Sequence, residues 1–374
     1  MADLCPDRIL ETIDAVSFYC YLFAGAMLAS LMVACGPSRW QSRLWRFAVV
    51  LLLFVPAAIR CDIGTDYYRI YAPIIDNGLC HADGAYQEWE PAVQAICQLI
   101  IREGLATQWF FAITAAITCF AAVMSFPRKG FPWCVLVFFV VGYLPSYNIV
   151  RQMLAVSLSM LAFSLYLQRR VLWSILFFVA AVLFHKSIVL CVPIVVLAFS
   201  ACRFPPSALL CCCLGLAVFL ALANPIQIAL EVLERIPVVS SYLSYESREN
   251  FMESGVKTGL GLVLWCVVEL ALGTFILLRG KGRCYRVTAL LCLMAFLVKL
   301  ASAKVYIIDR LSLFTEAILP FAMCFAWRLR RGVADTLLLL GVAMLVVFAL
   351  IYNYGFDSKA PGAHEVLPYQ TIFD

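Results

Sequence analysis

Apolar runs of roughly 16 to 22 residues recur along almost the whole chain, and mostly short polar segments separate them. Such a run can cross a bilayer as one α-helix, because about 20 residues at 1.5 Å each match a hydrocarbon core of about 30 Å. Of the 374 residues, 64% are hydrophobic and 14% are charged, which leaves no room for a separate soluble domain. The sequence therefore predicts an all-α polytopic membrane protein, with residues 1–374 forming a single integral membrane domain.

We expect about twelve transmembrane helices, and the acidic residues before the first argue that it is an uncleaved span rather than a signal peptide. The longest polar connections are the expected outer loops 61–106 and 224–257. The expected spans are residues 13–35, 44–60, 107–126, 131–146, 149–168, 171–185, 187–201, 207–223, 258–278, 287–302, 311–327 and 333–352.

Alternate connections are strictly basic, which predicts the orientation. Together they carry fifteen Lys or Arg and no acidic residue, and under the positive-inside rule they face the cytoplasm. Both termini are then non-cytoplasmic. Residues 171–200 are too many for one helix, so we expect two short helices meeting at "FHKS", Phe184 to Ser187, in a recess that water or ligand can enter.

This topology places most of the unusual polar residues on the non-cytoplasmic face. Arg60, Arg151 and Arg310 lie at outer helix ends, where the positive-inside rule depletes arginine. Ionisable residues at such depth are usually functional and paired, and the guanidinium fork matches phosphate oxygens. The three arginines could clamp a diphosphate; alternatively, each snorkels or pairs with a nearby carboxylate.

Three further residues could carry proton chemistry. Asp66, in the "DIGTDYY" turn, could orient an arginine or accept a sugar hydroxyl, or it could be a solvated loop residue. Glu90 precedes Pro91 and is either a general base, a ligand of a sugar hydroxyl, or a plain helix cap, since acids are favoured at helix N-termini. His185, at the expected helix break, could act as acid or base near neutral pH or be structural.

The remaining polar and sulfur-containing residues indicate no cofactor. Most of the 17 cysteines lie in apolar runs, and with 3 distant histidines a His-based metal site is not expected. Cys61 and Cys80 share a loop and could form a bridge. Lys299 and the two acids Glu269 and Glu316 lie within expected spans. They could mark a proton path, or they could form a structural cluster. No phosphate-binding loop, Rossmann glycine pattern or hydrolase elbow is present.

Several motifs, in order, resemble the EpsG family of membrane proteins, which is related to the Wzy-type polymerases of bacterial exopolysaccharide and O-antigen synthesis. They are "RCDIGTDYYRIY" (Arg60 to Tyr71), "EWEPAVQAI" (Glu88 to Ile96), "YNIVRQMLAVSL" (Tyr147 to Leu158), "LFHKSIVL" (Leu183 to Leu190), "DRLSLFTEAILP" (Asp309 to Pro320) and "LPYQ" (Leu367 to Gln370). The family's glutamate before the third span has two candidates here, Glu88 and Glu90, and we prefer Glu90.

The resemblance implies a GT-C-like polymerase architecture in a bacterial inner (plasma) membrane, with the active site facing the periplasm or exterior. It implies a glycosyltransferase that moves a growing glycan from a polyprenyl diphosphate, such as undecaprenyl diphosphate, onto a lipid-linked repeat unit of a capsule, exopolysaccharide or O-antigen. Other polysaccharide-synthesis proteins are possible partners, and neither nucleic acid, nucleotide nor metal is expected.

The expected roles follow from the resemblance and from residue chemistry. Arg60, Arg151 and Arg310 would stabilise the departing diphosphate. Glu90 or His185 would remove the acceptor proton, and Asp66 would position an arginine or the acceptor. The sugar-stacking candidates are Tyr67, Tyr68 and Trp89.

Three other readings compete. A flippase of lipid-linked oligosaccharide would also need arginines and aromatics, but it predicts polar residues spread through the spans and internal repeats. A membrane acyltransferase would need a cytoplasmic acyl-donor site, yet the cytoplasmic loops are short. A non-catalytic scaffold would tolerate loss of Arg151.

Overall fold

The structure is a computed structural model that describes residues 6–64, 66–76, 89–222, 259–303, 306–351 and 371. The described residues are almost entirely helical, and their one β-bridge pairs Arg60 with Thr371. The predicted all-α class is therefore confirmed. The predicted outer loop 224–257 lies outside the described residues, as do Cys80 and Glu88.

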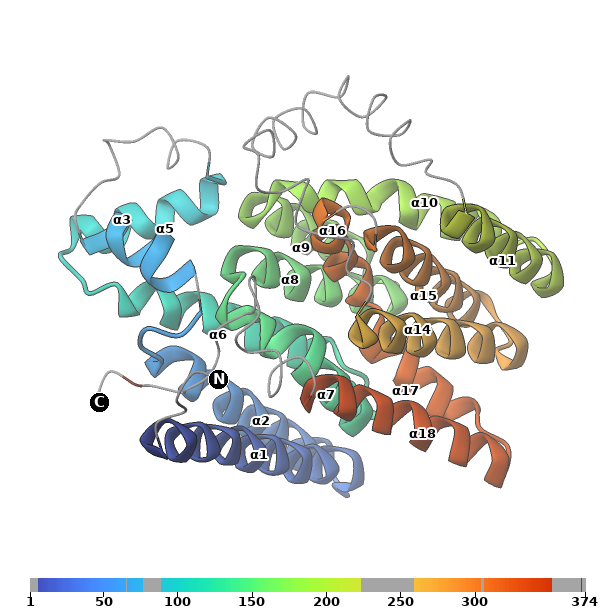
Figure 1. Cartoon of the computed structure of the whole chain (residues 1–374), viewed down its shortest axis with the longest axis horizontal. Coiled ribbons are helices and arrows are strands. Elements are labelled where there is room, and N and C mark those ends of the chain that lie inside the picture. Colours follow the sequence, from blue (N-terminus) through green and yellow to red (C-terminus); the bar gives the residue numbers. More distant parts are fainter. Residues whose placement is uncertain are drawn as a thin grey trace. The chain divides into compact units, whose positions relative to one another are not determined.

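The chain packs as two compact units, Met1–Val189 with Val347–Asp374, and Leu190–Val346. The elements of the first unit are α1 (Pro6–Cys35), α2 (Arg39–Ile59), η1 (Tyr67–Tyr71), α3 (Ala72–Asp76), α5 (Pro91–Arg102), α6 (Gln108–Ser125), α7 (Phe131–Phe138), η3 (Phe139–Tyr143), η4 (Pro145–Tyr147), α8 (Val150–Leu167) and α9 (Val171–Phe184). In this unit α1 lies beside α2, and α8 lies beside α9 (Figure 1).

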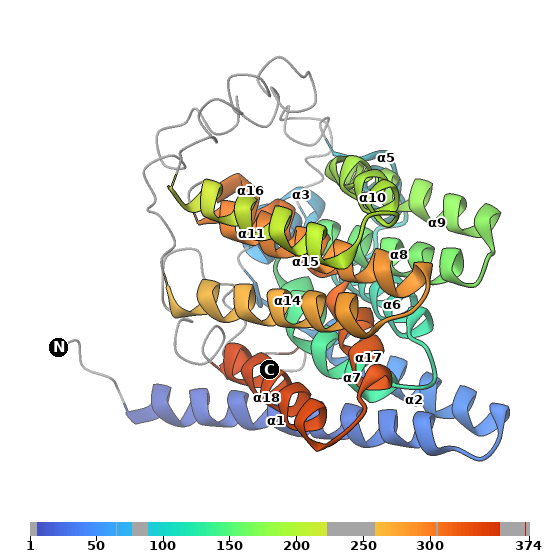
Figure 2. The same cartoon turned by 90° about the vertical axis from the view of Figure 1, so that its right-hand side faces the viewer.

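The second unit contains α10 (Cys191–Ala201), α11 (Pro206–Leu222), α14 (Leu260–Arg279), α15 (Arg283–Ser302), α16 (Tyr306–Glu316), α17 (Leu319–Leu329) and most of α18 (Val333–Leu350). The short helix η5 (Lys186–Leu190) lies at the boundary between the units. Within this unit α14 packs along α15, as Figure 2 shows.

Seven helical segments of the described chain are long and apolar enough to cross a membrane, and six more apolar helices are shorter. These segments identify a multi-pass membrane protein. The expected count of twelve spans and the expected location of the termini stay predictions.

The predicted break in the segment 171–200 is confirmed. Helix α9 ends at His185, which has extended backbone angles (φ −158°, ψ 104°), and η5 then leads into α10. Because the two pieces are separate short helices, the backbone around His185 has polar groups that no helix satisfies.

Two stretches show how the sequence produces these elements. Ser38 and Gln41 form a reciprocal capping box that starts α2 after a tight turn. Helix α5 begins at Pro91 and buries Val93, Cys97 and Ile100. These three residues recur at four- and three-residue spacing and so share one face.

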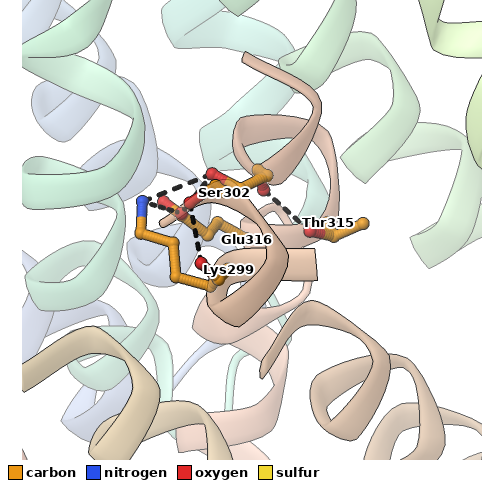
Figure 3. Close-up of polar contacts among 5 residues, drawn as sticks. Lys299, Ser302, Thr315 and Glu316 are labelled. Atoms are coloured by element: carbon orange, nitrogen blue, oxygen red, sulfur yellow. Dashed lines mark hydrogen bonds and ion pairs between the residues drawn. The ribbon is translucent and has the colours of Figure 1, made fainter. Parts of the chain in front are cut away.

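A buried polar cluster links α15 to α16 in the second unit (Figure 3). Lys299 Nζ lies 2.9 Å from Glu316 Oε1, and Ser312 Oγ donates to the same oxygen at 3.0 Å. Glu269 of α14 is fully buried, and its two carboxylate oxygens have no hydrogen-bond partner among the described residues. The structure thus contains a Lys299–Glu316 ion pair, and Glu269 is not hydrogen-bonded to it.

Candidate functional site

The "DIGTDYY" turn packs closely against the segment that precedes α8. Gly64 has φ +88°, and a Cβ built there would lie 2.3 Å from the carbonyl oxygen of Tyr147. The backbone N–H of Asp66 donates to Asn148 Oδ1 at 3.2 Å. Only glycine fits both the left-handed backbone and this close approach, which confirms the predicted tight turn. The turn therefore fixes where Asp66 lies relative to the start of α8.

Substituting Gly64→Ala should destabilise the protein by at least about 2 kcal/mol, since an L-residue here meets both backbone strain and a backbone clash. Thermal unfolding in detergent measures the loss. Gly104→Ala is a matched control, because Gly104 also has a positive φ of 61° but nothing lies within 4 Å of its added Cβ. Equal losses in both variants would show that strain alone, and not the contact with Tyr147, explains the effect.

The aromatic residues of this region form a packed cluster. The ring of Tyr67 stacks on that of Phe111 at 4.5 Å and 9°, and Tyr71 stacks on Phe110 at 4.7 Å. Trp89 lies 5.6 Å from Tyr71 and is only 8% exposed. Two of the three candidate sugar platforms, Tyr67 and Trp89, are thus buried in the core, while the side chain of Tyr68 lies outside the described part of the chain.

Arg60 is enclosed by aromatic rings and is only 2% exposed. Its guanidinium carbon lies 4.6 Å from the ring centre of Tyr147 and 4.9 Å from that of Phe111. Nη2 donates to the carbonyl oxygen of Ser146 at 3.5 Å, and Nε has no hydrogen-bond partner among the described residues. Arg60 therefore lies beneath the surface, with one donor uncommitted.

Glu90 connects three helix ends of the first unit. Its Oε2 accepts a hydrogen bond from Arg151 Nη1 at 2.9 Å, and its Oε1 accepts one from the backbone N–H of Lys186 at 3.2 Å. His185 Nδ1 lies 3.1 Å from Oε1, and the two groups form an ion pair when the imidazole is protonated. Glu90 occupies the N-cap position of α5, but its side chain makes no capping hydrogen bond to that helix. The carboxylate instead joins α5, α8 and the break after α9.

The surroundings of Arg151 extend this cluster. Its guanidinium lies 5.0 Å from the ring centre of Trp89, and its charge acts on Tyr71 and Asp66. The structure thus brings Asp66, Trp89, Glu90, Arg151 and His185 together, and we call these five residues the acidic–basic cluster. Its side chains are largely buried, with His185 14% and Arg151 23% exposed.

Charge strongly favours the ionised form of Glu90. Burial raises its pKa, but the proximity of His185 and the charge of Arg151 outweigh burial and lower the pKa to about 2. A carboxylate of such low pKa is a weak base at neutral pH. Of the two candidate bases, Glu90 is therefore the less suited to remove a proton, and its Oε1 lies 3.1 Å from Nδ1 of the other candidate, His185.

The depressed pKa of Glu90 predicts a pH dependence of stability. Because the folded-state pKa lies below the usual value of 4.5, the ionised carboxylate stabilises the fold above about pH 4.5, and this contribution disappears as the pH falls toward 2. The free energy of unfolding of the wild type should exceed that of Glu90→Gln by on the order of 3 kcal/mol at pH 7. Unfolding of both proteins from pH 3 to 7 tests this: a difference that stays constant with pH would contradict the assignment.

Other predicted residues fall outside what the structure describes or brings together. Arg310 lies in α16 of the second unit, and its side chain is not described. Glu88 is not described either, so its comparison with Glu90 stays open. In the described ranges, no group of three or more His, Cys, Asp or Glu residues could hold a metal ion.

Three members of the site were not among the predicted residues. Asn148 anchors the turn, Phe111 encloses Arg60, and the backbone N–H of Lys186 binds Glu90. Asn148 lies three residues before Arg151 in the sequence, at the start of an expected span, and this position could have indicated that it belongs to the site. Phe111 is one of 27 phenylalanines, and backbone donors have no sequence signature.

Comparison with known protein families matches residues 43–371 to the EpsG family, nearly the whole chain. The chain belongs to the EpsG family. Membership of EpsG identifies it as a membrane protein of the polysaccharide-polymerase type, involved in polysaccharide biosynthesis. The match includes every residue of the acidic–basic cluster as well as Arg60 and Arg310. No curated protein and no solved structure matched the chain.

Proposed function

We propose that this EpsG protein is a glycosyltransferase that polymerises a bacterial surface polysaccharide. It transfers the growing glycan from a polyprenyl diphosphate, such as undecaprenyl diphosphate, onto a lipid-linked repeat unit. The observation that carries the proposal is the acidic–basic cluster, in which Glu90 contacts both His185 and Arg151 at the ends of three helices. A base and a cation fixed to one carboxylate suit a reaction that removes a proton and expels an anion.

In the proposed step, the oxygen of an acceptor hydroxyl forms a bond to the anomeric carbon of the donor glycan. The bond between that carbon and the phosphate oxygen breaks, and the electron pair leaves with the diphosphate. The hydroxyl proton passes to Nε2 of His185, because Nδ1 faces Glu90 Oε1 at 3.1 Å. The ionised carboxylate then stabilises the imidazolium that forms.

Arg151 offsets the negative charge of the departing diphosphate. Nη1 is held by Glu90 and the guanidinium rests against Trp89, so the side chain is fixed before the substrate arrives. Preorganised donors of this kind stabilise a developing anion without reorganisation. Asp66, whose charge acts on Arg151, serves to position it.

The remaining roles stay proposals. Arg60 and Arg310 are diphosphate ligands, and Tyr67, Tyr68 and Trp89 contact sugars. For this role the ring of Tyr67, now packed on Phe111, and that of Trp89, now packed on Arg151, must become accessible.

We further propose twelve spans, both termini outside the cytoplasm, and an active site facing the periplasm or exterior of an inner (plasma) membrane. The reaction needs neither nucleotide nor metal, because the lipid diphosphate is itself the leaving group.

The Arg151→Ala variant tests this proposal, with Arg102→Ala as control. Arg102 has a side chain 82% exposed and, among the described residues, pairs only with the adjacent Glu103, whereas Arg151 is largely buried on Glu90. Purified protein is supplied with lipid-linked repeat units and no nucleotide sugar, and the glycan ladder is followed on a gel. We expect Arg151→Ala to form ladder at least about 100-fold more slowly, with Arg102→Ala near the wild-type rate.

A wild-type protein that is folded but makes no ladder would instead support a flippase of lipid-linked oligosaccharide. Equal, measurable rates for wild type and Arg151→Ala would remove Arg151 from the mechanism.

A further inference from the structure

Two turns of the second unit line an open surface cavity of about 660 Å³. One turn joins α10 to α11, and the other joins α14 to α15 as "RGKGR", Arg279 to Arg283. The cavity is lined by the side chains of Arg203, Lys281, Arg283 and Arg286, and no acidic residue lines it. It therefore concentrates positive charge in a hollow large enough for a phosphate group.

The contacts of these basic side chains leave most of their donors available. Arg286 Nη1 donates to the carbonyl oxygen of Cys202 at 3.0 Å, which ties the two turns together. Arg203 Nε donates to Ser200 at 3.1 Å, and the guanidinium of Arg283 lies 5.4 Å from the ring centre of Phe199. Among the described residues none of the four cations has an ion pair, so their charge is not neutralised by the protein.

The backbone adds to this positive potential. Helix α15 begins at Arg283, directly after Gly282, and no side chain caps its first amides. Gly282 has φ +107°, and nothing lies within 4 Å of a Cβ built on it, so the approach to the helix start is open. Uncapped amides at a helix start favour an anion, and here the basic side chains surround them.

We propose that this cavity binds a phosphate group, which extends beyond the polymerase function. The shared chemistry is a phosphate anion held by guanidinium, ammonium and amide donors. Two sources could supply it: the headgroup of an anionic phospholipid such as phosphatidylglycerol, or free inorganic phosphate. In the expected topology the basic turns lie at the cytoplasmic leaflet, where anionic headgroups are at hand.

A second basic hollow supplies a matched comparison. Arg328 and Arg330 line a cavity of about 590 Å³ together with Thr336. Asp335, the residue before Thr336, accepts the backbone N–H of Arg331 at 2.8 Å and binds Arg279 at 2.9 Å. Arg330 Nη1 is satisfied by the carbonyl oxygen of Trp327 at 2.6 Å. Because the second hollow has only two basic lining residues, and one donor of Arg330 is engaged, it is a poorer anion site.

The test uses full-length protein in a neutral detergent. Binding of phosphatidylglycerol, phosphatidylcholine and inorganic phosphate is measured separately by native mass spectrometry and by thermal shift. The variant is Lys281→Gln with Arg283→Gln, two exposed side chains outside the proposed catalytic machinery. The control is Arg328→Gln with Arg330→Gln, which removes the same charge from the second hollow.

We expect phosphatidylglycerol to bind and phosphatidylcholine not to bind. The Lys281→Gln/Arg283→Gln variant should lose affinity about tenfold or more, while the control loses less than about twofold. If inorganic phosphate binds instead, and the Lys281→Gln/Arg283→Gln variant shows the same loss of affinity for it, the site belongs to the free anion. Equal losses in variant and control, or no binding of either phosphate source, would overturn the proposal.

Should the double variant not fold, Lys281→Gln alone decides the question. Lys281 has no hydrogen bond or ion pair with any described residue, so its loss removes ligand contacts without removing structural ones. We expect its affinity for the bound phosphate source to fall about threefold. Unchanged affinity would contradict the proposal.

Discussion

Replacing His185 with alanine should slow polymer formation by about two to four orders of magnitude, the usual contribution of a positioned general base. The chain should still fold, because His185 lies at a break between helices and is not part of the hydrophobic core. The rate is measured as ladder formed per unit time at saturating lipid-linked substrate, and folding is measured by thermal unfolding.

The conservative variant His185→Asn separates catalysis from structure. The Asn amide can donate to Glu90 Oε1 as the ring Nδ1–H can, but it cannot accept a proton as imidazole does. If His185 is the base, both variants lose activity and the dependence of rate on pH disappears. Retained activity in His185→Asn would show that the ring only shapes the helix break, and it would return the role of base to a carboxylate.

Removing the cation of the buried pair in the second unit should produce the largest loss of stability. In Lys299→Met, Ser312 is the one polar partner that Glu316 keeps among the described residues, in a buried setting where Glu316 is 3% exposed. Breaking a buried pair in this way typically costs about 3–5 kcal/mol. Thermal unfolding in detergent should show this as a markedly lower midpoint.

Two further variants test the reason for that loss. Lys299→Met combined with Glu316→Gln removes both charges and should recover most of the stability, since Ser312 can still bond to the amide. Glu269→Gln should change the free energy of unfolding by less than about 1 kcal/mol. The reason is that an ionised carboxylate with no hydrogen-bond partner among the described residues is costly to bury, so we expect the amide to replace an uncharged carboxyl group. No recovery in the double variant would mean that Lys299 acts by packing rather than by charge.

Charge and spacing in the sequence predicted much of the candidate site. The basic turns placed Glu90, Arg151 and His185 on one side of the membrane, and the structure joins these three residues through one carboxylate. The excess of residues between 171 and 200 predicted the helix break at His185. Both features follow from simple constraints, namely the preference of lysine and arginine for one side and the length of a helix.

The sequence could not predict which partner each charge takes. Arg60 and Arg151 look alike at helix ends, yet Arg60 lies among the rings of Phe111 and Tyr147 while Arg151 binds Glu90. The rings around Arg60 come from residues 51 and 87 positions further along the chain, so only tertiary packing brings them to it. For the same reason the burial of Tyr67 and Trp89 was not expected from a loop rich in charge.

The most direct test of the central claim is the stoichiometry of carrier release. Purified protein in liposomes is given lipid-linked repeat units, and both the glycosidic bonds in the ladder and the free polyprenyl diphosphate are counted. Each glycosidic bond formed must release one carrier, so we expect a ratio of one to one. In His185→Ala, we expect both the glycosidic bonds and the free carrier to be lost. Movement of intact lipid-linked units across the bilayer, with neither ladder nor free carrier, would contradict the polymerase and identify a flippase.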